Sequence, residues 1–239
     1  MKAMIFAAGL GTRLRPLTDN KPKALVEING KTLLEITIQK LKAAGFNSIV
    51  VNVHHFSGLV IDFLKKNDNF GLDIEISDET DLLLDTGGGL KKAAPLLGTQ
   101  EPVLIHNVDI VSNIDIGELY TQHCQSSALA TLATMERDSS RQLLVNSKGI
   151  LCGWQNKSTG EKKISQPSET DLTPISYCGI AVLNPQFLTL IEENGVFSII
   201  DVYLRLAKNF DIQTANQENI NWSDVGTVES LKRLRRNVN

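Results

Sequence analysis

The sequence predicts an α/β protein with a doubly wound, mostly parallel central sheet, to which a smaller and partly antiparallel layer is added. Two observations predict this fold class. From residue 1 to residue 109, short apolar runs alternate with segments of helical periodicity, which is the pattern of successive βαβ units. After residue 109, strand-like runs follow one another with turn residues between them and few helical segments, which favours antiparallel pairing.

The first half of the chain is predicted to alternate strands and helices. The segment KTLLEITIQKLKAAG has apolar residues near helical spacing and ends on Gly45, a common helix stop. Continuous apolar runs such as PVLI, residues 102–105, indicate strands that helices cover on both faces. The predicted order is a strand at 2–8, a helix at 31–45, a strand at 47–53, a helix at 56–66, a strand at 72–77, a helix at 88–97 and a strand at 102–109.

The second half is predicted to be richer in strands. The polar segment QNKSTGEKKISQPSETDLTP, residues 155–174, is predicted to be a loop or a hairpin. A chain of 239 residues is within the size of one hydrophobic core, so we expect a single domain, 1–239. The predicted strands are 127–135, 142–154 and 175–183, and helices are predicted near 185–192, 198–209 and 228–236.

Composition argues against several classes of function. The net charge of −3 gives no overall positive field to attract nucleic acid, and the apolar runs fall well short of the roughly 20 residues that span a bilayer. The three cysteines, Cys124, Cys152 and Cys178, lack CxxC spacing, which is typical of a reducing compartment and not of structural zinc. We therefore expect a cytoplasmic protein with no nucleic-acid or membrane partner.

The loop after the first predicted strand, AAGLGTRLRPLTDNKPK at residues 7–23, is rich in glycine and positive charge. Ligands of open α/β sheets bind outside the carboxyl ends of the strands, where this loop lies. Gly9 and Gly11 allow backbone N–H groups to turn toward an anion. The loop also contains the cations Arg13, Arg15, Lys21 and Lys23. It therefore predicts phosphate binding, with a tight surface turn carrying incidental charges as the alternative.

Two common phosphate-binding motifs do not fit this chain. The dinucleotide fingerprint GxGxxG requires glycine or alanine where this loop has Leu14. The Walker A motif that would end on Gly30-Lys31-Thr32 requires glycine where the chain has Leu25. The predicted phosphate site is therefore of another kind.

Read as GxGTRxxPLT followed by KPK, the loop resembles the signature of sugar-1-phosphate nucleotidyltransferases. Further segments keep the order of that family, and the resemblance covers essentially the whole chain. It implies a Rossmann-like, GT-A-like fold and transfer of a nucleoside monophosphate from a nucleoside triphosphate to a sugar 1-phosphate, with release of pyrophosphate. The further segments are LDTGGG at 84–89, HNVDI at 106–110, YCGIAVLNP at 177–185 and WSDVGT at 222–227.

The resemblance also implies which residues bind the nucleotide. Because the second pKa of a phosphate is about 6, the attacking sugar phosphate is already anionic, and the reaction needs charge neutralisation more than a general base. By resemblance, Arg13 stabilises the leaving pyrophosphate and Lys23 contacts the α-phosphate or the sugar phosphate, which makes these two the expected catalytic residues. The expected nucleotide-binding residues are Ala8, Gly9, Gly11, Thr12, Arg13, Lys23, Thr86, Gly87 and Asn107.

Asp109 and Asp224 match the two metal motifs of the family, so the resemblance implies that they hold Mg²⁺. This cation commonly takes one or two protein carboxylates together with phosphate oxygens and water. A turn or helix-cap aspartate is the alternative for each. The two positions are far apart in the sequence, and it is the family motif alone that brings them to one site.

In the second half, the resemblance implies that Gly179 and Tyr177 line the sugar pocket. Residues 1–110 would then bind the nucleotide, and residues 111–239 would bind the sugar and supply the second metal ligand. A buried strand tyrosine that only packs is the alternative for Tyr177.

The chain departs from the family pattern near this expected pocket. Val108 stands where the commoner metal motif has glycine, Ser140-Arg141-Gln142 stand where many relatives open a strand with glycine, and a Val-Glu-Lys-Pro motif is absent. The spacing of DTGGG and GIAVL nevertheless resembles the N-acetylmuramate-1-phosphate uridylyltransferase group, which recycles cell-wall sugar and uses UTP. Mannose-1-phosphate guanylyltransferase and a non-catalytic nucleotide-sugar-binding regulatory protein are the alternatives. A monomer or a small homo-oligomer is expected.

Overall fold

The computed structural model describes residues 1–98, 100–167 and 171–237. Its helices are α1 (Leu33–Ala43), α2 (Ser57–Lys66), α3 (Asp85–Leu97), α4 (Ile116–Cys124), α5 (Pro185–Thr189), α6 (Ile199–Leu206) and α7 (Val228–Asn237). Its strands are β1 (Lys2–Phe6), β2 (Glu27–Ile28), β3 (Lys31–Thr32), β4 (Ser48–Val53), β5 (Asp73–Asp78), β6 (Val103–Asn107), β7 (Ile110–Ser112), β8 (Ala130–Met135), β9 (Arg141–Val145), β10 (Leu151–Asn156), β11 (Glu161–Ile164), β12 (Thr173–Leu183), β13 (Ile212–Asn216) and β14 (Trp222–Asp224).

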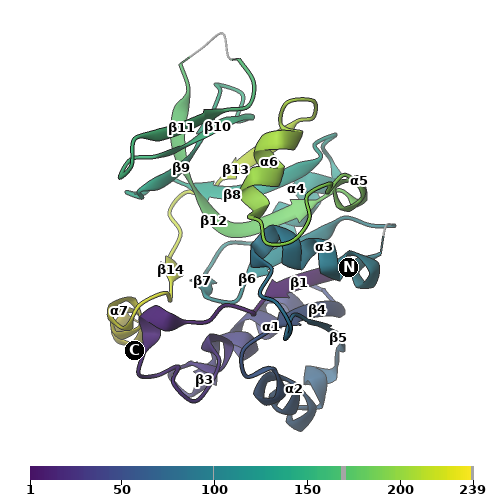
Figure 1. Cartoon of the computed structure of the whole chain (residues 1–239), viewed down its shortest axis with the longest axis vertical. Coiled ribbons are helices and arrows are strands. Elements are labelled where there is room, and N and C mark those ends of the chain that lie inside the picture. Colours follow the sequence, from purple (N-terminus) through teal and green to yellow (C-terminus); the bar gives the residue numbers. More distant parts are fainter. Residues whose placement is uncertain (99, 168–170, 238–239) are drawn as a thin grey trace.

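A mixed sheet of ten strands forms the centre of the described residues (Figure 1). Strands β6, β1, β4 and β5 are parallel neighbours. The long strand β12 pairs antiparallel with β6, β8 and β9. Strand β9 in turn pairs antiparallel with β10, and β10 pairs antiparallel with β11. The strands of the second half therefore extend the parallel sheet through β12, and the carboxyl ends of β1, β4 and β6 meet at one edge, where ligands of such sheets bind.

Helices cover both faces of the sheet, so the fold is doubly wound. Along β1, Ala3 and Ile5 belong to the hydrophobic cluster that contains residues of α1, α2, α4 and α7. Met4, between them, points to the opposite face and belongs to the cluster that contains residues of α3, α5 and α6. Because successive strand residues point to opposite faces, this alternation requires apolar residues throughout the central strands, as the continuous apolar runs predicted.

Some helix bounds differ from the predicted ones. Helix α3 begins at Asp85 and not near residue 88, because the N–H groups of Gly87 and Gly88 are held by the carbonyl of Phe197, a contact between distant segments. Helix α5 ends at Thr189, before the predicted 192, and α6 is shorter than the predicted 198–209. For α3, a tertiary contact thus sets where the helix begins.

Several elements were not predicted, among them the short strands β2 and β3, which pair with each other. Helix α4 begins after Asp115, whose carboxylate accepts a hydrogen bond from the Glu118 N–H at 2.9 Å; this Asp-x-x-Glu spacing is a helix-start signal that the sequence does contain. Strand β13 is short and pairs parallel with β8. Strands β7 and β14 form a separate antiparallel ribbon between segments that are distant in sequence, and no local pattern marks it.

The polar segment 155–174, which was predicted to be a loop or a hairpin, contributes to a hairpin. Strands β10 and β11 pair antiparallel from Gly153–Ile164 to Asn156–Glu161. Residues 168–170, which also belong to the predicted loop or hairpin, lie outside the described residues. The hairpin extends the sheet at the end opposite β5.

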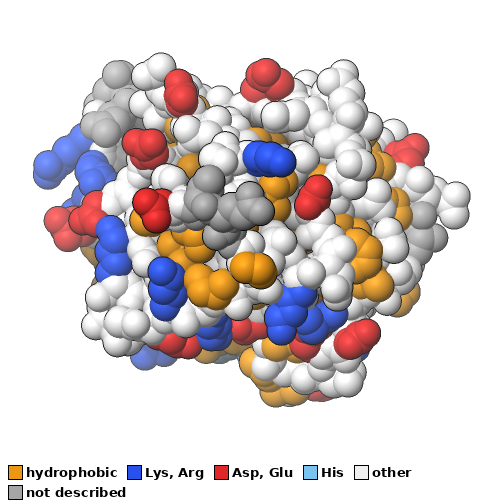
Figure 2. Space-filling model, turned by 90° about the horizontal axis from the view of Figure 1, so that it is seen from above, with side chains coloured by type: hydrophobic (Ala, Val, Ile, Leu, Met, Phe, Trp, Pro, Cys, Tyr) orange, Lys and Arg blue, Asp and Glu red, His pale blue; other side chains and the backbone are white. Residues whose placement is uncertain are grey.

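None of the helices in the described ranges has the length and apolar character that crossing a bilayer requires. On the face that Figure 2 shows, lysine and arginine side chains lie interspersed with aspartate and glutamate side chains and are not gathered by sign. This face therefore carries no concentrated field of one charge.

Candidate active site

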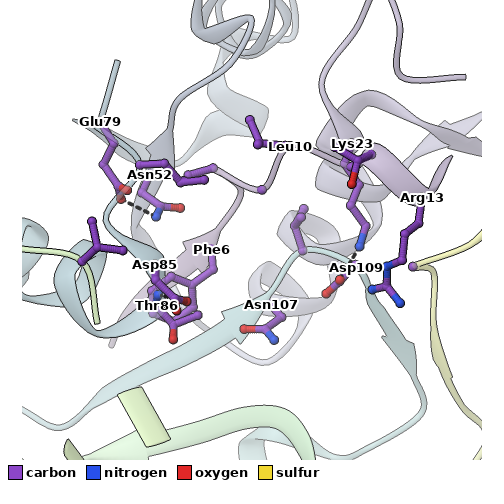
Figure 3. Close-up of a pocket in the computed structure, with 18 residues that line it drawn as sticks. Phe6, Leu10, Arg13, Lys23, Asn52, Glu79, Asp85, Thr86, Asn107 and Asp109 are labelled. Carbon is purple, nitrogen blue, oxygen red and sulfur yellow. Dashed lines mark hydrogen bonds and ion pairs between the residues drawn. The ribbon is translucent and has the colours of Figure 1, made fainter. Parts of the chain in front are cut away.

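A cavity of about 550 Å³ lies at the edge of the sheet where β1 and β6 end (Figure 3). Two groups of residues are separated within it. Lys23, Arg13 and Asp109 gather on one side, while Glu79 and Thr86 lie on the other. Its lining consists of Phe6, Ala8, Gly9, Leu10, Gly11, Thr12, Arg13, Lys23, Asn52, Glu79, Leu83, Asp85, Thr86, Asn107, Val108, Asp109, Val196 and Gly226. Most of the predicted nucleotide-binding residues are thus brought to one place.

The backbone of the loop at the cavity's charged side requires glycine at position 11. Gly11 has φ +64°, and a Cβ there would lie 3.0 Å from both the Lys23 Cβ and the Thr18 Cγ2. The Thr18 hydroxyl donates to the Gly11 carbonyl at 2.8 Å, and the N–H of Leu14 donates to the same carbonyl at 2.9 Å. Because an L side chain would meet both strain and contact, the tight turn depends on this glycine.

Lys23 is buried and its ammonium group forms an ion pair with the Asp109 carboxylate. The guanidinium of Arg13 lies beside the backbone at Gly226, where a Cβ would be 2.9 Å from an Arg13 terminal nitrogen. Among the described residues, Arg13 has no carboxylate within 4 Å. The charged side therefore presents one cation paired to an aspartate and one that can meet an incoming anion.

The ribbon of β7 and β14 brings the two predicted metal-binding aspartates together. Asp224 lies opposite Ile110, and the N–H of Val225 donates to the Asp109 carbonyl at 2.9 Å. Burial, and next the charge of Asp109, raise the pKa of the Asp224 carboxyl. Its Oδ1 is buried and has no hydrogen-bond partner in the part of the chain that the structure describes. A buried, unpartnered carboxylate oxygen next to a second carboxylate fits a hard divalent cation.

Figure 3 also shows a buried pair, Asn52 and Glu79, that the sequence analysis missed. The Asn52 amide donates to Glu79 Oε1 at 2.6 Å, and its own oxygen accepts from the Ala7 N–H at 2.6 Å. Glu79 Oε2 accepts from the Leu84 N–H at 3.1 Å. The pair ties the start of the glycine-rich loop to the segment before α3. A polar residue within the apolar run SIVVNV was the available signal.

The two residues of the segment LDTGGG that are predicted to bind the nucleotide occupy different environments. Thr86 lines the cavity, and its hydroxyl accepts from the Ile199 N–H at 3.0 Å. Gly87 is not part of the lining; its N–H donates to the Phe197 carbonyl at 2.9 Å, and a Cβ there would lie 2.4 Å from the Phe197 ring. The glycine therefore permits close packing of α3 against 195–199 and positions its neighbour Thr86.

Apolar side chains also line the cavity. Val196 and Leu10 are 59% and 43% exposed, which is unusual for large apolar residues. Together with Phe6 and Leu83 they give the cavity an apolar portion next to its charged portion. An apolar wall beside cations suits a ligand with a planar base and a polyphosphate.

A second cavity of about 580 Å³ lies beside the first and shares Arg13 with it. Tyr177 lines it, and so do all three residues of the departure Ser140-Arg141-Gln142. Gly179 lines neither cavity. Its φ is +77°, and a Cβ there would lie 2.9 Å from Ile110 and 3.0 Å from the Asn107 amide. The complete lining is Arg13, Arg137, Ser139, Ser140, Arg141, Gln142, Leu143, Trp154, Tyr177, Ile200 and Asp224.

Comparison with known sequences identifies the class of this site. The sequence model of the family described as nucleotidyl transferase matches residues 2–239. The chain is 34% identical to an N-acetylmuramate alpha-1-phosphate uridylyltransferase of Caulobacter vibrioides, over 95% of this chain and 93% of that protein. It is 32% identical to a protein of the same name from Neisseria meningitidis serogroup B, over 97% and 96%. A mannose-1-phosphate guanyltransferase of Yarrowia lipolytica is also 32% identical, over 95% of this chain and 61% of that protein.

Solved structures share the fold. A UDP-glucose pyrophosphorylase in complex with UDP-glucose superimposes with a TM-score of 0.80 at 17% identity, over 99% of this chain and 97% of that chain. The inositol-1-phosphate CTP transferase of T. maritima has a TM-score of 0.78 at 15% identity, over 99% and 95%. The family match spans nearly every residue, and identities above 30% extend along almost the full length of two relatives. This chain therefore belongs to the nucleotidyl transferase family, as a sugar-1-phosphate nucleotidyltransferase.

Proposed function

We propose that this enzyme transfers the uridylyl group of UTP to N-acetylmuramate 1-phosphate, forming UDP-N-acetylmuramate and pyrophosphate. The observation that carries the proposal is the similarity to two uridylyltransferases of this name along nearly their whole length. The mannose-1-phosphate guanyltransferase relative is matched over 61% of its length. Arg13, Lys23 and Asp109 line the first cavity, and Asp224 lines the second, which shares Arg13 with the first; this arrangement supports catalysis where the two cavities meet.

In the proposed reaction, an anionic oxygen of the sugar phosphate attacks the α-phosphorus of UTP. A new P–O bond forms, the bond from the α-phosphorus to the oxygen that bridges to the β-phosphate breaks, and pyrophosphate leaves with that electron pair. The attacking phosphate is deprotonated near neutral pH, so the protein's task is to align two polyanions and to neutralise the shifting charge.

We assign the charged residues to that task. Arg13 lines both cavities, so its guanidinium is placed to stabilise the leaving pyrophosphate from the junction between them. Lys23 is held by Asp109 in this structure and would contact the α-phosphate or the sugar phosphate when substrates bind. Asp109 and Asp224 would hold Mg²⁺, which neutralises triphosphate charge when bound.

We assign the remaining lining residues to the nucleotide. The loop residues Ala8, Gly9, Gly11 and Thr12 would bind the β- and γ-phosphates through backbone N–H groups, as anion-binding loops do. Thr86 and Asn107 would contact the nucleoside, and Gly87 would act by positioning Thr86. The proposed division is a nucleotide-binding half, 1–110, and a half, 111–239, that binds the sugar.

Nucleoside triphosphates are abundant in the cytoplasm, where we propose that the enzyme acts. The residues of both cavities come from this chain alone, so the proposed reaction is compatible with a monomer or a small homo-oligomer. The reaction would return a recycled cell-wall sugar to its nucleotide-linked form.

A pyrophosphate-release assay with a matrix of substrates tests the proposal. Purified protein is supplied with UTP, GTP, CTP, dTTP or ATP, each against N-acetylmuramate 1-phosphate, mannose 1-phosphate and glucose 1-phosphate, with Mg²⁺ or with excess EDTA. We expect the highest kcat/KM for UTP with N-acetylmuramate 1-phosphate and no turnover with EDTA. A clear preference for GTP with mannose 1-phosphate would instead assign the guanylyltransferase activity.

A further inference from the structure

Arg137, which follows β8, is held in place from two sides. Its guanidinium carbon lies 4.3 Å from the centroid of the Trp222 ring. The indole N–H of Trp222 donates to the Cys178 carbonyl at 3.0 Å, which fixes the ring. The buried Ser176 hydroxyl donates to the Arg137 carbonyl at 3.2 Å. Because both the backbone and the stacking partner are anchored on β12, the guanidinium is preorganised.

This fixed guanidinium lacks an anionic partner within the described residues. Its Nε is buried and has no hydrogen-bond partner in that part of the chain, and no carboxylate there lies within 4 Å of it. Arg205 provides the contrast, because its Nε and a terminal nitrogen donate to Glu193 at 2.6 and 3.0 Å. A buried polar group without a partner costs free energy. The unpartnered Nε of Arg137 therefore indicates that a ligand supplies the missing acceptor.

Arg137 lines the second cavity, on which the proposed function places the sugar. Three arginines line this cavity, Arg13, Arg137 and Arg141, while Asp224 is its one acidic lining residue. Arg13 also lines the first cavity and is assigned to the transferred phosphates. Arg137 and Arg141 therefore remain as two separate positive groups in the second cavity, and two such groups suit a substrate that carries a second anionic group in addition to its phosphate.

We propose that Arg137 pairs with a carboxylate on the sugar and makes the enzyme selective for acidic sugar 1-phosphates. The proposal rests on the proposed function and deepens it, because N-acetylmuramate carries a carboxylate on its lactyl ether in addition to the phosphate at C1. A planar guanidinium held against Trp222 can meet a carboxylate with two parallel N–H···O bonds, which lysine cannot reproduce. Arg137 is thus a specificity-determining residue.

The test compares pairs of substrates that differ in one carboxylate. Wild type, Arg137→Gln, Arg137→Lys and the exposed-surface control Arg233→Gln are assayed with N-acetylmuramate 1-phosphate and with N-acetylglucosamine 1-phosphate, which lacks the lactyl ether. We expect Arg137→Gln to lower kcat/KM for the muramate substrate roughly 10- to 100-fold, mainly through KM, and to change the glucosamine substrate less than about 3-fold. Arg137→Lys keeps the positive charge but not the planar guanidinium, so its kcat/KM for the muramate substrate should lie between those of wild type and Arg137→Gln. Arg233→Gln should match wild type.

Equal losses with both substrates would overturn the proposal, since Arg137 would then hold the phosphate or only the cavity wall. So would a wild-type enzyme that prefers the neutral sugar. A second pair, glucuronate 1-phosphate against glucose 1-phosphate, separates this proposal from the proposed function. If wild type rejects muramate but prefers glucuronate through Arg137, the muramate assignment fails and the carboxylate assignment stands. Thermal unfolding of each variant confirms that it is folded, and Arg137→Lys carries the test should Arg137→Gln unfold.

Discussion

The two cavities share Arg13, yet their walls are built from different chemical groups. One part of the first is formed by the loop at 8–13, which has a tight turn at Gly11 that admits no side chain. The second is lined by long polar side chains, among them Arg137, Arg141 and Gln142. A backbone cradle suits phosphate groups, which every nucleoside triphosphate shares, whereas side chains can be tailored to one sugar. We therefore propose that the first cavity serves the chemistry common to the family and that the second sets the choice of substrate.

Asp224 lines the second cavity and ends strand β14 of the ribbon that brings it next to Asp109 of the first, and its replacement is expected to have the largest effect. Asp224→Asn should lower kcat roughly 10²-fold or more with every sugar phosphate, because a metal ligand acts on the transferred phosphates. Burial disfavours the ionised carboxylate, as its raised pKa indicates, so the variant's melting temperature should stay equal or rise. Pyrophosphate release and thermal unfolding measure the two effects, with the exposed Asp62→Asn as the control. Near-normal turnover would remove Asp224 from the metal site.

Replacement of Glu79 tests whether the buried Asn52–Glu79 pair keeps the first cavity rigid. Glu79→Gln presents an NH₂ group to the N–H of Leu84 or to the amide of Asn52, both of which are donors. We expect the variant to lose roughly 2 kcal/mol of unfolding free energy, the cost of an unsatisfied buried polar group, and to raise the KM for the nucleotide. Urea unfolding measures the loss. The exposed Glu101→Gln should change neither quantity, and an unaltered Glu79→Gln would mean that the pair does not support the loop.

Two glycines of one loop provide a matched test of the backbone cradle. Gly11→Ala places a side chain at positive φ and 3.0 Å from Lys23 and Thr18, so we expect a loss of about 1–2 kcal/mol of unfolding free energy. Gly9→Ala meets no atom within 4 Å and should leave stability unchanged. Chemical denaturation of both variants decides the matter; equal stabilities would show that the turn does not require glycine at position 11.

The smallest expected effect lies in the second cavity. Gln142 is buried in its wall, and the Gln155 amide donates to its oxygen at 3.0 Å. Gln142→Ala should raise the KM for the sugar phosphate several-fold, within the roughly tenfold that one neutral hydrogen bond supports, and leave the KM for the nucleotide unchanged. Steady-state kinetics with each substrate varied in turn separates the two constants. The exposed Gln122→Ala on α4 is the control, and a rise in the nucleotide KM would contradict the division between the cavities.

Much of the first half of the fold could be predicted because its signals are local. The alternation of apolar runs with helical segments is present in the order of residues, and the structure has helices on both faces of the sheet as this pattern predicted. Helix α4 carried a local start signal at Asp115 that was overlooked. The extent of α3 could not be predicted in the same way, because the Phe197 carbonyl that holds its first turn belongs to a distant segment.

The candidate site also contains residues with local sequence signals and residues whose role depends on tertiary contacts. The glycine spacing and clustered charge of residues 7–23, together with their place after the first predicted strand, indicated phosphate binding, because backbone conformation and charge are properties of a short segment. Residues without a motif of their own, such as Glu79 and Arg137, went unnoticed. Their importance comes from their neighbours in the folded chain. Glu79 accepts hydrogen bonds from the Asn52 amide and the Leu84 N–H. Arg137 lies over the Trp222 ring, and its buried Nε has no hydrogen-bond partner among the described residues.

The order of residues was sufficient for the α/β class, the glycine-rich loop that is predicted to bind phosphate and, through its motifs, the family. Folding supplied the rest. It placed Asp224 beside Asp109, gave Gly87 a packing contact with Phe197, and gathered Arg13, Arg137 and Gln142 around a second cavity. The physical reason is the range of the interactions. Backbone preference and hydrophobic periodicity act over a few neighbouring residues, whereas strand pairing, burial and charge–charge contacts join residues that meet when the chain is packed.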